Sequence, residues 1–93
     1  MMNLTSQQKR ALKARAHHLK PVVRIGQKGI TDSLLAETEQ ALEAHELIKM
    51  HVAIDDRNTR HAMAESVAEK TGAAVVAHIG KISILYRPKD ECR

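Results

Sequence analysis

The stretch VVRIGQKGIT, residues 22–31, carries the clearest structural and chemical signal in this chain. Its first four residues mostly favour strands, and two glycines then flank a polar, basic pair. Thr31 is a typical N-cap residue, and Ile30 is spaced to pack on Leu35 as a hydrophobic staple at the start of a helix. The pattern therefore predicts a strand, a tight loop and a helix in succession.

The loop of this motif has the properties of an anion site. Glycine lets the backbone turn sharply and lets a bulky group approach, because no Cβ stands in the way. The loop's free amides and the positive end of the following helix should point at the same place, beside Lys28. Gly26, Gln27, Lys28 and Gly29 are therefore predicted to hold a phosphate of a nucleic-acid backbone, although any strand-to-helix loop favours glycine.

Length and composition limit the class of protein. The 93 residues, 43% of them hydrophobic, suit a single domain with one modest core. The single Cys92 excludes a disulfide framework and a cysteine zinc site, and it suits a reducing compartment. No apolar run approaches the roughly 20 residues of a membrane span, and the polar stretch Met1–Arg10 does not resemble a signal peptide. We expect a cytoplasmic protein that does not enter membranes.

The charge is unevenly distributed along the chain. Residues 1–30 contain seven basic side chains and no acidic one, whereas residues 31–93 contain eight basic and eleven acidic side chains, for a net charge of +4. Such an asymmetry favours a polyanionic partner on one side of the molecule, although a solvated basic face without a partner would look the same.

Aromatic side chains are almost missing from the chain. Tyr86 is the only one, so neither a sheet with stacking aromatics of the RRM kind nor an aromatic groove of the OB kind can be built. A nucleic-acid partner must then be held mainly by its phosphates and its shape.

The remaining segments predict three helices and four strands in the order αβαβαββ. A capping box of Thr5 and Gln8 begins the first helix, which should reach about Leu19 before the Lys20-Pro21 step. The other elements are a helix at about 32–45, an alternating strand at 47–54, a helix capped by Asn58 or Thr59 and reaching about Thr71, strands at 74–79 and 82–86 joined by the Gly80-Lys81 turn, and a loose tail at 88–93.

This order predicts an α/β fold with a four-stranded mixed sheet. Crossover helices make the first three strands parallel or nearly so, and the hairpin makes the last pair antiparallel. The strands are not continuous apolar runs, because polar side chains occupy alternate positions in them: Arg24, Lys49, His51 and His78. A sheet buried on both faces would not show this alternation. We therefore expect a two-layer sandwich with the helices on one face of the sheet and the other face wet.

Several short motifs in this order resemble the CRM domain, the chloroplast RNA splicing and ribosome maturation module, in its free-standing bacterial form. The resemblance extends from about Leu4 to Pro88. It rests on LKPV at 19–22, IGQKGIT at 25–31, ELIK at 46–49, IGK at 79–81 and LYR at 85–87.

The resemblance implies a compact αβαβαββ fold similar to the C-terminal domain of a bacterial translation initiation factor. It also implies RNA binding, association with precursors of the large ribosomal subunit during assembly, and a GxxG loop likened to that of KH domains. Residues 26–29 would be the RNA-contacting loop, with Lys20, Arg24 and Lys81 as basic neighbours. A KH loop joins two helices, whereas this one is expected to join a strand to a helix, so the clamping of four nucleotides need not transfer.

Other chemistry has less support in the sequence. The adjacent His17 and His18 would face about 100° apart on a helix, and HExxH and partner cysteines are missing, so no metal site is expected. His51 and His78 are interpreted as wet-face or RNA-contacting residues. The P-loop and dinucleotide fingerprints are absent and no nucleophile elbow is present, so we expect neither catalytic residues nor a cofactor or small-molecule substrate.

The prediction is a non-catalytic protein that binds ribosomal RNA of large-subunit precursors through backbone phosphates. One alternative is a DNA-binding module that uses the same basic face. The other is a protein-binding adaptor that docks through apolar residues of the second helix or through Met63, although core packing explains those residues as well. The oligomeric state stays open. The predicted RNA-binding residues are the loop Gly26, Gln27, Lys28 and Gly29 and the basic surface Lys9, Arg10, Lys13, Lys20, Arg24, Lys49 and Lys81.

Overall fold

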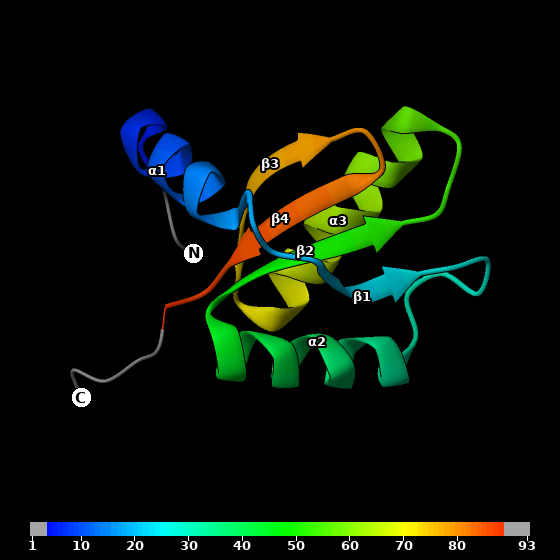
Figure 1. Ribbon diagram of the computed structural model, residues 1–93. Coiled ribbons are helices and arrows are strands. Elements are labelled where there is room, and N and C mark those ends of the chain that lie inside the picture. Colours follow the sequence, from blue (N-terminus) through cyan, green and yellow to red (C-terminus); the bar gives the residue numbers. More distant parts are fainter. Residues whose placement is uncertain (1–3, 89–93) are drawn as a thin grey trace.

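The structure is a computed structural model that describes residues 4–88 (Figure 1). Its helices and strands follow one another in the predicted order. They are α1 (Ser6–Ala16), β1 (Pro21–Ile25), α2 (Asp32–His45), β2 (Leu47–Val52), α3 (Arg57–Thr71), β3 (Ala74–Ile79) and β4 (Ile82–Tyr86). The predicted loose tail lies outside the described residues apart from Pro88. Within residues 4–88, no helix is both long and apolar enough to cross a membrane.

The four strands form one mixed sheet in the order β1-β2-β4-β3. β1 pairs with β2 in parallel, and β4 lies between β2 and β3 and is antiparallel to both. The first three strands therefore run in one direction and the last runs against them, as predicted. Among the described residues 4–88, β1 is an edge strand of the sheet, so no strand of this part of the chain pairs with the other side of its backbone.

The larger part of the core lies on one face of the sheet, under α2 and α3 (Figure 1). Alternate residues of β2 point into it, and Ile48, Met50 and Val52 are all buried there. Leu42 of α2 and Val67 of α3 are fully buried against the same face. Because burying one such side chain stabilises a fold by about 1.5–3 kcal/mol, this layer is the main source of stability.

The position of α1 corrects the expectation that all helices lie on one face. Leu12 and Ala16 of α1 pack on the opposite face, against Leu47, Val76 and Ile84 of the sheet. The polar Lys49 and His51 had indicated a wet face, but Leu47 shares their side of β2 and is buried. That face is therefore divided: one end is apolar and covered by α1, and the remainder of β1 and β2 stays open.

Local capping residues explain where the helices begin. The Thr5–Gln8 capping box is present, with the Gln8 N–H donating to Thr5 Oγ1 at 3.0 Å. The third helix begins earlier than predicted, because its N-cap is Asp56 and not Asn58 or Thr59. Asp56 Oδ2 accepts hydrogen bonds from both the backbone N–H and the hydroxyl of Thr59, at 2.8 and 2.7 Å. The hydroxyl bond and then the backbone bond lower the pKa of the Asp56 carboxyl.

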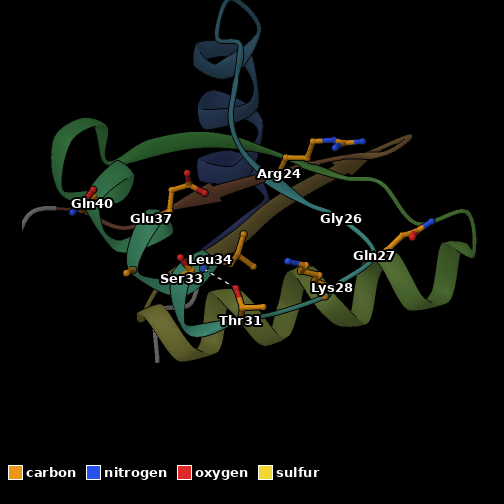
Figure 2. A pocket seen from close by; sticks show the side chains of 11 residues that line it. Arg24, Gly26, Gln27, Lys28, Thr31, Ser33, Leu34, Glu37 and Gln40 are labelled. Atoms are coloured by element: carbon orange, nitrogen blue, oxygen red, sulfur yellow. Dashed lines mark hydrogen bonds between the residues drawn. The ribbon is translucent and has the colours of Figure 1, made fainter.

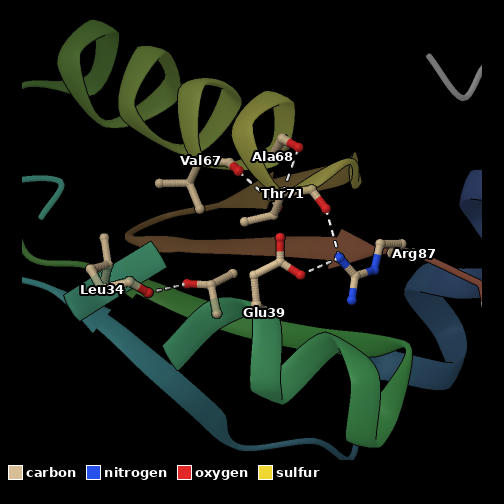
Figure 3. Close-up of polar contacts among 7 residues, drawn as sticks. Leu34, Glu39, Val67, Ala68, Thr71 and Arg87 are labelled. Atoms are coloured by element: carbon tan, nitrogen blue, oxygen red, sulfur yellow. Dashed lines mark hydrogen bonds and ion pairs between the residues drawn. The ribbon is translucent and has the colours of Figure 1, made fainter. Parts of the chain in front are cut away.

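Arg87, just after β4, connects the two helices of the main layer (Figure 3). Its Nη1 donates to Glu39 Oε1 of α2 at 2.6 Å and to the carbonyl of Thr71, at the end of α3, at 2.8 Å. Its backbone N–H donates to the carbonyl of Glu46 at 2.8 Å. This residue therefore ties the end of the sheet to both helices.

Replacing Arg87 by Met is expected to lower the free energy of unfolding by about 1–2 kcal/mol. This loss is smaller than the full contribution of the hydrogen bonds that Arg87 donates, because the carboxylate of Glu39 can bind water in their place. The Arg87 side chain is 23% exposed and that of Glu39 is 46% exposed. Urea unfolding measures the loss. Arg57→Met, at an exposed position at the start of α3, is the matched control. Equal stability of the two variants would contradict this role of Arg87.

Candidate nucleic-acid interface

The glycine loop forms a closed turn between β1 and α2, as the sequence predicted. The N–H of Gly29 donates to the carbonyl of Gly26 at 3.0 Å, and Gln27 and Lys28 are exposed at the tip. Thr31 caps α2, accepting a hydrogen bond from the Leu34 N–H at 3.0 Å. The turn is thus fixed at both ends while its tip stays accessible.

The backbone donors of the turn are fewer than the sequence suggested. Gly29 uses its N–H to close the turn, whereas the amides of Gln27 and Lys28 donate to no protein acceptor within residues 4–88. Asp32 lies in the first turn of α2, where its carboxylate offsets part of the positive helix end. The attraction for an anion at this place therefore depends chiefly on Lys28 and the two amides.

A hollow of about 510 Å³ adjoins the turn and is bounded by Arg24 on one side and by α2 on the other (Figure 2). Figure 2 shows the Lys28 side chain pointing back toward α2, whereas Gln27 points away from it. Lys28 can therefore meet a group lodged in the hollow, and Gln27 can meet one that passes over the turn.

The open part of the sheet presents further cations. Arg24 of β1 and His51 of β2 are register partners, and Lys20 lines a second hollow together with both of them. Lys49 lies two residues before His51, and its Nζ is 3.5 Å from the carbonyl of His17, where α1 ends. We call the surface formed by these residues and by the exposed side of α1 the basic face.

The basic face continues onto α1. Arg10 and Lys13 line a shallow depression together with His17 and His18. Lys9 is exposed one turn before Lys13. Figure 1 shows α1 at the opposite end of the molecule from the turn that follows β1. The predicted cations thus form two groups, one on α1 and one at the turn, which are connected through Lys20, Arg24 and Lys49.

Lys81 differs from the other predicted cations. Its Nζ forms a 3.0 Å ion pair with Asp55 Oδ1, and both side chains are exposed. It lies in the β3–β4 turn, and its carbonyl accepts a hydrogen bond from the Val52 N–H. The carboxylate offsets its charge, so Lys81 is expected to attract a phosphate less strongly than Arg24 or Lys28 does.

One predicted wet-face residue, His78, is on the other side of the sheet. Its ring stacks on that of His61 in α3, with centroids 3.8 Å apart, and its Nδ1 is 3.0 Å from Ser83 Oγ. An irregular register between Val75 and Ala77 changes the alternation in β3, and this turns His78 toward α3. His51 is on the open face as predicted.

Acidification below pH 6.5 is expected to lower the stability of the fold through His78. Burial, and then the charge of His61, lower its pKa in the folded state from 6.5. The unfolded chain then takes up the proton first, so this contribution is complete above pH 6.5 and is lost as the pH falls toward the folded-state pKa. Urea unfolding from pH 8 to pH 5 measures it. His78→Gln should flatten this dependence, whereas the exposed-site control His45→Gln should retain it.

Sequence reasoning missed the polar stripe on α2 that faces the hollow. Ser33, Glu37 and Gln40 line it together with Ala36. Their spacing places them on one stripe of the helix directly after the glycine turn, and this spacing was the available signal. Helical spacing places His17 on one stripe with Lys9, Lys13 and Lys20, but it did not connect His18 with Arg10, and both of these also line the depression on α1. Within residues 4–88, no three metal-ligating side chains come together.

Comparison with known proteins agrees with the residue motifs. The sequence model of a protein family, the CRS1 / YhbY (CRM) domain, matches residues 4–87 of this chain. The chain belongs to the CRM domain family. This confirms the resemblance inferred from the sequence motifs.

Relatives of this CRM chain match over nearly its whole length. A Haemophilus influenzae protein named as an RNA-binding protein is 47% identical over 93 residues, which is 100% of this chain and 94% of the relative. A Bacillus subtilis protein, named provisionally for RNA binding, is 35% identical over 88 residues, covering 95% of this chain and 92% of the relative. Both relatives therefore have about the size of this chain.

A solved structure has the same CRM fold. The solution structure of a Staphylococcus aureus protein, described as a candidate RNA-binding protein, has a TM-score of 0.85 and 34% sequence identity to this chain. It covers 98% of this chain and 95% of its own chain. The fold class expected from the sequence is thereby confirmed.

Proposed function

We propose that this CRM protein binds RNA without catalysing a reaction and associates with ribosomal RNA in precursors of the large ribosomal subunit. The observation that carries the proposal is the exposed, hydrogen-bonded glycine turn, which presents Lys28 and two free amides at one end of the basic face. Family membership and the names of the relatives support RNA as the partner. The ribosomal target follows from the resemblance to the CRM module.

The grip on the RNA is through backbone phosphates. Gly26, Gln27, Lys28 and Gly29 form the contact loop, and the basic face supplies further cations from β1, β2 and α1. Tyr86, the only aromatic residue, is partly buried and packs against the core layer under α1, so it offers no open stacking platform. Phosphate contacts make affinity dependent on salt, because each contact releases counterions.

Crosslinking in cells, followed by sequencing of the bound RNA, tests the ribosomal target. Fragments of large-subunit ribosomal RNA should be enriched, and the protein should sediment with precursors of that subunit and not with free messenger RNA. An even distribution over unrelated transcripts would contradict the ribosomal target. The variant in which Gln27 and Lys28 are both Asp serves as control, because it should recover little RNA of any kind.

Salt dependence separates the proposal from an apolar docking surface. The logarithm of the binding constant should fall linearly with the logarithm of the salt concentration, with a slope set by the number of phosphates contacted. A nearly flat line would indicate apolar docking. A DNA duplex of the same length is the competitor that distinguishes RNA from DNA, since contacts to 2′-hydroxyl groups exist only on RNA.

A further inference from the structure

A groove follows the free edge of β1. The hollow beside the glycine turn and a second one of about 600 Å³ share Arg24 and Glu37, so the two adjoin along the strand. The second hollow extends past Val22 to Lys20 at the start of β1. Five strand residues span roughly 16 Å at about 3.3 Å each, a length that accommodates a few nucleotides of an RNA strand.

The two sides of the groove differ in chemistry. Lys20, Arg24 and Lys28 follow one another at every fourth residue on the side of β1 and the turn. On the α2 side, the exposed polar side chains are Glu37, Gln40 and Ser33, with the exposed Ala36 between them. Glu37 would repel a phosphate, whereas its carboxylate accepts hydrogen bonds from the N–H groups of a base. The groove is thus complementary to a nucleotide, with the phosphate side on β1 and the base side on α2.

The edge of β1 adds backbone groups to this groove. The carbonyl of Ile25 accepts a hydrogen bond from the Ala53 N–H at 2.9 Å, so the backbone polar groups of Ile25 point toward β2. Because these groups alternate in direction along a strand, those of Arg24 point to the free edge. The N–H and the carbonyl of Arg24 therefore face the groove, where the edge of an unpaired base can form hydrogen bonds with both.

We infer that this groove holds a short single-stranded segment of RNA, with its phosphates along Lys20, Arg24 and Lys28 and its base edges against α2 and the Arg24 backbone. The inference rests on the proposed function and adds a base-reading site to it. In a duplex the same base edges are already paired, so the groove selects unpaired RNA. Val22, which is 48% exposed, offers an apolar contact for a base.

The test uses a leucine on α2 that narrows the groove without changing charge. Ala36 lines the groove and is exposed, and Ala44 is exposed on the same helix and does not line it, so Ala36→Leu has the matched control Ala44→Leu. Affinities are measured for an unstructured 10-nucleotide RNA and for a 10-base-pair RNA duplex. Wild type should prefer the single strand. Ala36→Leu should weaken single-strand binding about tenfold, with the salt slope and duplex affinity unchanged, and Ala44→Leu should change neither.

A second variant tests base reading itself. A carboxylate accepts but does not donate, and cytosine presents an amino donor where uracil presents a carbonyl. Wild type should therefore bind a 10-nucleotide oligocytidine more tightly than an oligouridine, and Glu37→Gln should reduce that preference. Circular dichroism checks that both variants fold.

The outcomes distinguish the inference from the proposed function. If Ala36→Leu and Glu37→Gln bind all these RNAs as wild type does, the groove inference is overturned, while weak binding by the Gln27 and Lys28 variant would leave the proposed function intact. If wild type binds neither single strand nor duplex, the proposed function itself fails.

Discussion

Replacing both Gln27 and Lys28 by Asp is expected to weaken binding to ribosomal RNA by a factor on the order of 100. The change removes one cation and introduces two carboxylates at the tip of the turn. A hydrogen bond between a charged group and a phosphate contributes about 1.5–3 kcal/mol, and the new repulsion adds to its loss. Since about 1.4 kcal/mol corresponds to a factor of ten, the lost hydrogen bond and the added repulsion together weaken RNA binding about 100-fold.

The fold should tolerate this double replacement, because both side chains are exposed and the bond that closes the turn joins Gly29 to Gly26. Gel shift with a ribosomal RNA fragment measures the affinity, and the salt slope should fall by about one unit for each lost phosphate contact. Lys70→Asp, an exposed charge reversal near the end of α3, should bind nearly as wild type does. Wild-type affinity of the double variant would exclude the turn from the interface.

The two glycines of the turn are expected to differ in what alanine changes: stability at Gly29 and RNA affinity at Gly26. Gly29 has φ +73°, and a Cβ there would lie 3.6 Å from Met63 Cε, so Gly29→Ala should lower the free energy of unfolding by about 1–2 kcal/mol. Gly26 lacks a positive φ, and a Cβ there would meet nothing within 4 Å. Gly26→Ala should therefore leave stability within about 0.5 kcal/mol of wild type.

RNA affinity should instead decrease at Gly26. The added methyl group would stand where the proposed phosphate would approach the amides of the turn, and we expect about a tenfold loss, equivalent to about 1.4 kcal/mol. Urea unfolding and RNA titration of both variants provide the comparison, with Gly72→Ala as a second left-handed glycine outside the interface. If Gly26→Ala bound RNA as wild type does, the open space at this glycine would have no role in binding.

Local interactions made much of this fold predictable from sequence. The Thr5–Gln8 box, the Thr31 cap and the alternating residues of β2 act between residues close in the chain, and each was found where expected. The glycine turn belongs to the same class, since its closing bond spans three residues.

Contacts between distant segments account for what the sequence did not reveal. The side of the sheet covered by α1 depends on Leu12 and Ala16 meeting Leu47, which lies more than thirty positions along the chain. The insertion of β4 between β2 and β3 is a pairing choice with no local signal. An irregular register in β3 decides the direction of His78, and periodicity alone predicts the opposite face.

The candidate site follows the same division. The charge pattern identified the basic residues, but only their positions in the fold separate the α1 group from the turn and pair Lys81 with Asp55. The polar wall of the groove was overlooked because Glu37 and Gln40 are ordinary solvent-facing residues of an amphipathic helix when considered alone. They form one wall of a groove only because the folded chain places the free edge of β1 beside them.

Titration with a ribosomal RNA fragment, followed by NMR of the backbone amides, tests most directly whether the glycine turn grips RNA. The largest chemical-shift changes should occur at the amides of Gln27, Lys28 and Arg24, with smaller changes at Lys13 and at the end of α1. Shifts confined to α3 and the outer edge of β3, with the turn amides unmoved, would contradict the account.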